Sequence, residues 1–341
     1  IGLPNAEFIE LKNVSSRSFN LNGWQIGRGN SFATIRNNFT LAPDSFVIIC
    51  SGSSATLFSS FGATIGVTNF PSLSNDADQL ILRSNDGSTI HAVSYTAAWY
   101  KNAVKINGGW SLEMIDTQNP CSGMSNWTSS IDRRGGTPGT KNSVDEKNTD
   151  TEPPALLHAF ATDSHSIQLV FNEPLDSVAS SSPANFLISD GIGIPASAVV
   201  NPPFFQSVLL QINLPLDSNK IYTVNVNGIS DCSGNIIGAY HTARLGLAVQ
   251  PDAGDIVINE LLFNPTPDGV DYVEILNRGN NIIDLKDCFI ANRSSVNNIN
   301  SPKQIAIESR LLFPGDYMVV TEDATAIKKQ YLAKDPNAFT E

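Results

Sequence analysis

The chain has 341 residues, which is too long for a single hydrophobic core and suits about two or three domains. Its mean hydropathy is -0.07, and no apolar run approaches the ~18 residues of a membrane-spanning helix, so we expect no membrane span. The formal net charge is -12 and Lys and Arg form no cluster, which argues against binding to the phosphate backbone of a nucleic acid.

The first part of the chain reads as a series of short β-strands. Residues 7–13 (EFIELKN) alternate, with Ile9 and Leu11 on one side and Phe8 and Glu10 on the other. Turn sequences rich in Asn, Asp, Pro and Gly separate this strand from further predicted strands at 46–50, 79–82 and 90–95. Helical signal is slight, and we expect only a turn or two of helix at 55–61 and 324–332.

Two polar joints divide the chain. Residues 142–154 (NSVDEKNTDTEPP) carry a charge run, almost no apolar side chain and a Pro-Pro end, a composition typical of a linker. A different series of alternating strands then follows, at 166–171, 207–212 and 221–226. Residues 248–254, with Pro251 and Gly254, form the second joint.

One stretch of the first part is repeated in the sequence after the second polar segment, residues 248–254. Residues 6–13 and 21–26 return 264 positions later as 270–277 and 285–290, without a gap. Residues 41–49 return as 312–320, an offset of 271, so the second copy holds seven extra residues in one loop. The aromatic residue of the copy nearest to Trp24 is Phe289, one position beyond the offset of 264, and we expect a core aromatic at both positions. A repeat around an unrelated segment predicts the arrangement A–B–A′.

The four cysteines decide little by themselves. Cys50, Cys121, Cys232 and Cys288 form no CxxC pair and no metal-binding spacing. A disulfide between Cys50 and Cys121 is one open alternative and free thiols are the other, because spacing does not fix the geometry. We expect no cofactor and no metal site.

An aromatic residue beside a carboxylate recurs on the outward face of the repeated strand. Phe8 and Glu10 in the first copy become Tyr272 and Glu274 in the second. Such a pair could meet a sugar, a peptide or a cation. The alternative is a solvated strand face whose aromatic residue covers a neighbouring loop. These four residues are the candidate interaction surface.

Other polar groups give no site. The loops at 76–78 and 231–235 offer oxygens for Ca²⁺, but their spacing is not that of an EF-hand, and Asx turns explain both. The four histidines are scattered, and no nucleophile, zinc or phosphate-loop motif is present. Glu10 and Glu113 are one pair among many acidic residues, so they do not indicate a glycosidase. We therefore expect no catalytic residues.

The repeated module resembles the lamin tail domain, an immunoglobulin-like β-sandwich found in nuclear lamins and in many bacterial extracytoplasmic proteins. The matching residues are 7–13 (EFIELKN), 21–24 (LNGW), 41–43 (LAP), 109–113 (GWSLE) and 135–139 (GGTPG). The second copy carries the opening strand of the family at 256–265 (IVINELLFNP). The resemblance covers most of residues 1–144.

The middle segment resembles a bacterial Ig-like domain of surface-layer and cell-surface proteins. Residues 170–176 (VFNEPLD), 222–226 (YTVNV) and 231–235 (DCSGN) stand where that family has its signatures. We therefore predict an all-β chain of tandem immunoglobulin-like β-sandwiches. Its domains are a lamin tail-like domain at 1–144, a linker at 145–154, an Ig-like domain at 155–248 and a second lamin tail-like domain at 255–341.

These resemblances imply a non-catalytic scaffold or interaction protein, at the cell surface, in the periplasm or secreted, with a protein or an envelope glycan as partner. Two alternatives remain: the accessory region of an extracellular hydrolase or nuclease, and a carbohydrate-binding module. In the repeat alignment the opening strand of A′ has no counterpart in the first copy, and A′ stops where residue 70 would reappear. We expect a longer natural chain at both ends, or another cover for these strand edges.

Overall fold

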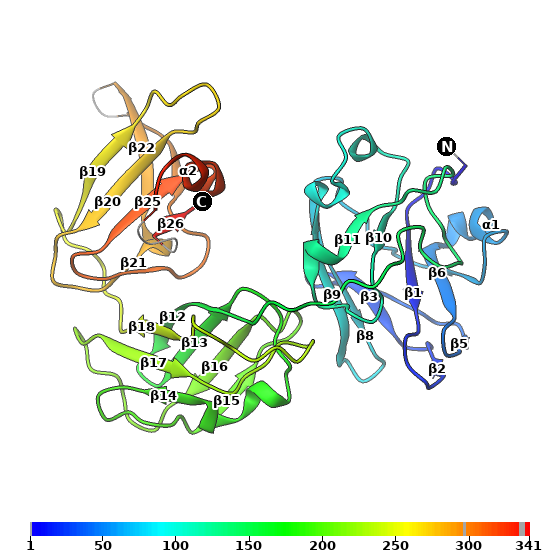
Figure 1. Ribbon diagram of the computed structural model, residues 1–341, viewed down its shortest axis with the longest axis horizontal. Helices are drawn as coiled ribbons and strands as arrows, with labels where there is room; N and C mark the ends of the chain where they lie inside the picture. Colours follow the sequence, from blue (N-terminus) through cyan, green and yellow to red (C-terminus); the bar gives the residue numbers. More distant parts are fainter. Residues whose placement is uncertain (1, 296–297, 334–337) are drawn as a thin grey trace. The chain divides into compact units, whose positions relative to one another are not determined.

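The computed structural model describes residues 2–295, 298–333 and 338–341, which form two compact units. The first unit comprises residues 2–152 with the segments 202–205 and 232–235. The second comprises 153–201, 206–231 and 236–341. Strands in several sheets dominate both units and helices are few, so the all-β, immunoglobulin-like prediction is confirmed (Figure 1).

The first unit contains two main sheets. One has the order β1 (Phe8–Lys12), β6 (Phe46–Ser51), β7 (Thr64–Val67). The other has the order β4 (Ser31–Thr34), β3 (Gln25–Arg28), β8 (Ala77–Arg83), β9 (Thr89–Thr96). Two short pairs complete it: β2 (Phe19–Asn20) with β5 (Thr40–Leu41), and β10 (Leu112–Met114) with β11 (Trp127–Ser129).

The predicted alternation of β1 holds. Ile9 and Leu11 pack on the core that Val47 and Ile49 of β6 share with the opposite sheet. Phe8 faces the other way, against a smaller cluster that contains Phe58. The helix α1 (Ala55–Phe58) lies within the predicted helical segment and supplies that phenylalanine.

The middle of the chain forms a two-sheet sandwich in the second unit. Its sheets have the orders β12 (Leu156–Asp163), β13 (Ser166–Phe171), β16 (Ser207–Gln211), β15 (Ser197–Val200), and β14 (Phe186–Ile188), β17 (Tyr222–Val226), β18 (Thr242–Leu245). Alternate residues of the strands, such as Leu169, Leu210 and Val224, are fully buried between the sheets.

The last part of the second unit holds the repeat. Its main sheet has the order β19 (Ile256–Leu262), β20 (Tyr272–Asn277), β25 (Tyr317–Thr321), β26 (Phe339–Thr340). Two pairs stand beside it: β21 (Ile283–Asp284) with β24 (Leu311–Leu312), and β22 (Phe289–Ser295) with β23 (Asn298–Gln304). The helix α2 (Ala324–Gln330) lies within the second predicted helical segment.

Single-turn 3-10 helices occur in the loops of both units. They are η1 (Gly52–Ser54), η2 (Ala97–Tyr100), η3 (Lys105–Asn107), η4 (Gly123–Asn126), η5 (Ala179–Ser181), η6 (Pro183–Asn185) and η7 (Leu285–Asp287).

The two copies of the repeat pair their strands in the same register. Phe8 lies opposite Cys50 in β1 and β6, and Tyr272 lies opposite Thr321 in β20 and β25. A parallel strand then follows in both copies, β7 beside β6 and β26 beside β25. The two sequence offsets of the repeat therefore correspond to one shared arrangement of strands.

The copies differ at their sheet edges. β19 pairs with β20, whereas no described strand takes the equivalent place beside β1. β3 has two neighbours, β4 and β8, whereas β22 pairs with β23 alone among the described strands. Phe289 at the start of β22 is 63% exposed, so its predicted core position is wrong. The offset of 264 places Cys288 in the position of Trp24, and Cys288 packs on the core of the copy.

The cysteine pairing differs from the alternative that the sequence left open. Cys121 is bonded to Cys232, with a Cα–Cα distance of 6.4 Å, while Cys50 is a buried free thiol. The Cys50–Cys121 pairing is therefore wrong. Cys50 lies inside β6, with its side chain in the cluster around Phe58, and is out of reach of Cys121 because of that packing.

The polar stretch predicted as a linker is hydrogen-bonded along the first unit. Asn142 Nδ2 donates to the Met114 carbonyl at 2.8 Å, and the Asn148 backbone N–H donates to Asp116 Oδ2 at 3.0 Å. Its low apolar content is compatible with this, because polar side chains hold it to the surface of the unit.

Candidate functional site

In the first unit, the Phe8/Glu10 face is covered. The rings of Phe8 and Phe58 lie 5.2 Å apart, centroid to centroid. The Gly139 backbone N–H donates a hydrogen bond to Glu10 Oε2. The packing of Phe8 on a neighbouring segment agrees with the second interpretation of the sequence, in which the aromatic residue covers a neighbouring loop.

Glu10 has an unusual ionisation equilibrium. Burial raises the pKa of its carboxyl from 4.5 to about 7, the Gly139 N–H opposes that shift, and the nearby Glu113 adds to it. Glu113 is itself buried, but hydroxyl groups and a backbone N–H surround both of its oxygens. Its donors are Ser111 Oγ, Thr137 Oγ1, Ser143 N and Ser143 Oγ, at 3.4, 2.8, 2.8 and 2.7 Å.

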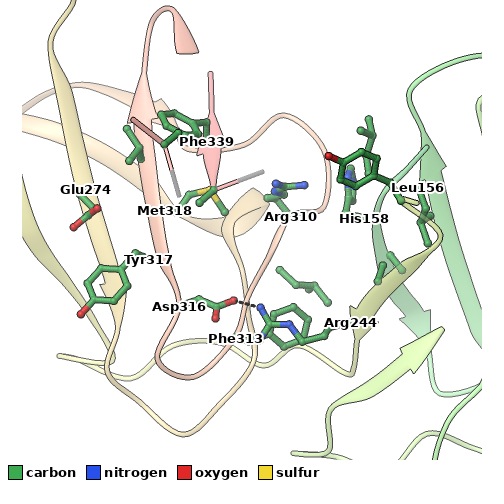
Figure 2. Close-up of a pocket in the computed structure, with 18 of the residues that line it drawn as sticks. Leu156, His158, Arg244, Glu274, Arg310, Phe313, Asp316, Tyr317, Met318 and Phe339 are labelled. Carbon is green, nitrogen blue, oxygen red and sulfur yellow. Dashed lines mark hydrogen bonds and ion pairs between the residues drawn. The ribbon is translucent and has the colours of Figure 1, made fainter. Parts of the chain in front are cut away.

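In the second unit, the equivalent face is open and lines a cavity of about 960 Å³. Tyr272 and Glu274 of β20 are among its lining residues. Glu274 lies beside Tyr317 (Figure 2). The Tyr272 hydroxyl donates to Glu260, which raises the pKa of Tyr272 to about 12, and Glu274 accepts a hydrogen bond from Asn259 Nδ2 at 2.7 Å.

An ion pair crosses the floor of this cavity. Arg244 Nη2 and Asp316 Oδ2 are 2.6 Å apart, and the Arg244 guanidinium lies 4.3 Å from the ring centre of Phe313 (Figure 2). Planar stacking on the ring and an ion pair together hold the arginine side chain in place.

His158 of β12 lines the opposite side of the cavity. Neither of its imidazole nitrogens has a hydrogen-bond partner among the described residues, although both are buried. Burial and the neighbouring Arg310 lower the pKa of His158 to about 4, so its ring is neutral at physiological pH. A neutral imidazole offers one donor and one acceptor to a polar group that enters the cavity.

The sequence-predicted residues therefore fall into two settings. Phe8 and Glu10 belong to the first unit and are covered, whereas Tyr272 and Glu274 line a cavity of the second. Sequence reasoning missed His158, Arg244 and Asp316, since they come from three segments that no local pattern connects.

The loop at 76–78 offered oxygens for Ca²⁺ in the sequence, but the Asp78 carboxylate is already paired with other groups of the protein. Asp78 Oδ2 lies 2.8 Å from Arg28 Nη1 and also accepts from the Ser74 backbone N–H. In the loop at 231–235, residues 232–235 belong to the first unit, where Cys232 is disulfide-bonded and the Ser233 hydroxyl donates to Asn119 Oδ1 at 3.1 Å.

Two families account for most of the first 244 residues. Residues 2–97 match the lamin tail domain and residues 147–244 match the bacterial Ig-like domain. The chain thus contains a lamin tail domain followed by a bacterial Ig-like domain, as both resemblances predicted. Residues 255–341 lie outside both matches, so their assignment as a second lamin tail domain rests on the internal repeat.

Solved structures of a bacterial S-layer protein resemble parts of this chain. The structure of rSbsC(31-844) is 22% identical, over 36% of this chain and 18% of that one, with a TM-score of 0.26. The N-terminal part of the bacterial S-layer protein SbsC is 19% identical, over 50% and 41% of the two chains, with a TM-score of 0.27. The chain thus spans less than half of either structure. No curated protein matches it.

Within residues 2–295, 298–333 and 338–341, no helix is long and apolar enough to cross a bilayer.

Proposed function

We propose that this protein is a non-catalytic scaffold of immunoglobulin-like modules that acts outside the cytoplasm and presents interaction surfaces. The observation that carries this proposal is that the two copies of the repeat share their strand pairing but differ in one surface. Its two copies keep one strand register, while the same outer face is covered by Phe58 and Gly139 in one copy and open in the other. Constant frameworks with variable surfaces are typical of binding modules.

The predicted domain boundaries belong to this proposal. The lamin tail-like domain spans 1–144, the linker 145–154, the Ig-like domain 155–248 and a second lamin tail-like domain 255–341. The Cys121–Cys232 disulfide supports an oxidising compartment, since structural disulfides persist mainly in exported proteins.

The groups with strongly shifted pKa values do not form a catalytic set. The Gly139 backbone N–H donates to the Glu10 carboxylate, and both carboxylate oxygens of Glu113 accept hydrogen bonds. His158 lies in the other unit and accepts or donates no hydrogen bond to a described nucleophile. Of these three groups only Glu113 accepts from hydroxyl groups, and it is buried away from any substrate, which supports the non-catalytic proposal.

Activity assays test it. We expect the purified protein to leave chromogenic phosphodiester, ester and glycoside substrates unchanged at pH 5–9. Turnover that His158→Ala or Glu10→Gln abolishes, and that His165→Ala retains, would show that the chain is an enzyme. His165 is a suitable control because it lies on an exposed turn of the same sandwich as His158.

The open cavity favours one interaction partner, an envelope glycan. Three half-exposed or more exposed tyrosines surround the cavity, at Tyr240, Tyr317 and Tyr331. Aromatic faces stack on sugar rings, while the neutral His158 and the Glu274 carboxylate suit hydroxyl groups. The site residues Tyr272 and Glu274 would then contact the sugar.

A glycan array checks this partner. Tyr272→Ala should lower the signal about tenfold, the loss of one aromatic contact of roughly 1.4 kcal/mol, and Tyr272→Phe, which keeps the ring, should retain most of it. Absence of any signal from the parent protein removes the glycan as partner and leaves a protein partner.

A further inference from the structure

A row of polar side chains crosses the outward face of β4, β3 and β8 in the first unit. Thr34 lies opposite Gln25, and Gln25 lies opposite Arg83, so the three residues form one line across three strands. Their sequence neighbours Trp24 and Leu82 pack on the core. Because successive residues of a strand point to opposite faces, this polar row lies on the side of the sheet away from the core.

An aromatic ring fixes the arginine of the polar row. Phe32 of β4 lies opposite Gly27 of β3, and a Cβ on Gly27 would stand 2.9 Å from Phe32 Cδ1, so the ring uses the space over the glycine. The Arg83 guanidinium stacks on the same ring, with its central carbon 4.2 Å from the ring centre. Stacking restricts the rotation of the side chain, so Arg83 is oriented before any ligand arrives.

The hydrogen-bonding groups of the polar row are unused by the described part of the chain. Thr34, Gln25 and Arg83 are half-buried, yet their side chains form no hydrogen bond to a described residue, and Arg83 forms no ion pair there. A guanidinium has five N–H donors, and their partial burial without acceptors costs free energy. The row is therefore a set of oriented groups that an external acceptor would satisfy.

A second arginine lies at the end of the polar row. The strand pairing continues through Ile35, whose backbone N–H donates to the Trp24 carbonyl and whose side chain is fully buried. Arg36 therefore points outward, on the side of Thr34. It is exposed and forms no ion pair with a described carboxylate, while Asp86, in the turn after β8, accepts hydrogen bonds within its own turn. Two arginines without an acidic partner, in a chain of net charge -12, favour an oxyanion at this face.

We propose that the polar row, with Arg36 at its end, binds an acidic glycan and that an oxyanion of the glycan lies on Arg83. The planar guanidinium matches two oxygens of a carboxylate or of a phosphate. The Gln25 amide and the Thr34 hydroxyl both donate and accept, so they suit the hydroxyl groups of the adjoining sugar.

A glycan fits this face better than a peptide does. β3 lies between β4 and β8, so its backbone groups are used in the sheet and a peptide cannot add to it as a strand. The polar row belongs to the first unit, whereas the Tyr272/Glu274 cavity belongs to the second. The proposal therefore goes beyond the proposed function, and its failure leaves that function standing.

Calorimetric titration of the whole protein tests the polar row. Hexagalacturonate is the carboxylate probe, and its full methyl ester is the uncharged control. We expect the acid to bind at least about tenfold more tightly than the ester, because only the acid offers an oxyanion to Arg83. A glycerol phosphate polymer, titrated in parallel, identifies the group: tighter binding of this polymer assigns a phosphate, and tighter binding of hexagalacturonate assigns a carboxylate.

Three variants separate the site from the general charge of the protein. Arg83→Gln should weaken binding of the preferred probe by about tenfold or more, since a charged hydrogen-bonding partner is lost. Arg83→Lys keeps the charge but not the planar fork and should recover only part of the affinity. Arg133→Gln removes the same charge from an exposed turn of the same unit, so it should change the Kd by less than about twofold.

NMR of the parent protein places the ligand independently of any variant. The backbone amide signals of Gln25, Thr34 and Arg83 should shift on titration, while that of His158 in the cavity stays in place. Shifts confined to the cavity would contradict the proposal, as would no binding of either charged probe at about 5 mM. Equal weakening by Arg83→Gln and Arg133→Gln would reduce the effect to general charge. Poly-glutamate that binds as tightly as the preferred glycan would make an acidic protein segment the occupant instead.

Discussion

At the scale of single residues, one buried asparagine holds each copy of the repeat together. Asn13 Nδ2 donates to the carbonyls of Leu41 and Arg17, and Asn277 Nδ2 donates to those of Leu312 and Asn281. Both hydrogens of each buried side-chain amide are used in this way, as a buried polar group requires, and each amide joins a strand, β5 or β24, to a loop carbonyl. The equivalent asparagine in each copy therefore stabilises the loop that follows β1 and the loop that follows β20.

Glu10 gives a prediction about pH. Its pKa is raised to about 7 in the folded protein, from 4.5, so the folded state binds its proton more tightly than the unfolded state. The stabilising contribution is complete below pH 4.5 and is lost as the pH rises through about 7. Glu10→Gln should remove this loss and stabilise the first unit at pH 8 by about 3 kcal/mol, since the pKa rises from 4.5 to about 7 and one pKa unit corresponds to ~1.4 kcal/mol.

Urea unfolding at pH 5 and pH 8 measures this effect, with Glu7→Gln as the control. Glu7 precedes the same strand but is exposed, so its replacement should leave the pH dependence in place. An equal slope of stability against pH in the parent and in Glu10→Gln would contradict the assignment.

At the scale of elements, the turn at 135–140 closes the first unit onto β1. Gly139 has a backbone φ of +81°, and a Cβ there would lie 2.2 Å from the Phe61 carbonyl oxygen. Gly139→Ala should therefore push the turn off β1 and lose the hydrogen bond to Glu10, at a cost of about 3 kcal/mol or more.

The matched variant is Gly87→Ala. Gly87 also has a positive φ, +88°, but nothing lies within 4 Å of its added Cβ, so the cost should be about 1 kcal/mol, from the backbone alone. Thermal unfolding of both variants separates the steric contact from the backbone preference. Equal shifts in Tm would mean that the turn does not pack on Phe61.

Sequence reasoning worked best where local patterns specify structure. Alternation in residues 7–13 predicted β1 with the right faces, and the repeat predicted the pairing of β20 with β25 by its constant offsets. It did not find the cavity, whose His158, Arg244 and Asp316 meet only through folding. It misplaced Phe289 because Cys288, one residue earlier, is the register equivalent of Trp24, and successive residues of a strand point to opposite faces.

At the scale of the whole molecule, the Cys121–Cys232 disulfide links positions 111 residues apart, and both half-cystines belong to the first unit. A crosslink over so long a loop restricts the unfolded chain, so its removal should be costly. Cys121→Ser with Cys232→Ser should lower the stability of the protein by about 2 to 4 kcal/mol, whereas Cys288→Ser, at a free and half-buried thiol, should change it much less.

Thiol counting in denaturant decides the pairing independently of stability. The unreduced protein should release two thiols, Cys50 and Cys288, and the reduced protein four. Peptide mapping after blocking should recover Cys121 joined to Cys232. A Cys50–Cys121 peptide would contradict the Cys121–Cys232 pairing and would require β6 to leave the sheet, because Cys50 is fully buried between β1 and β7.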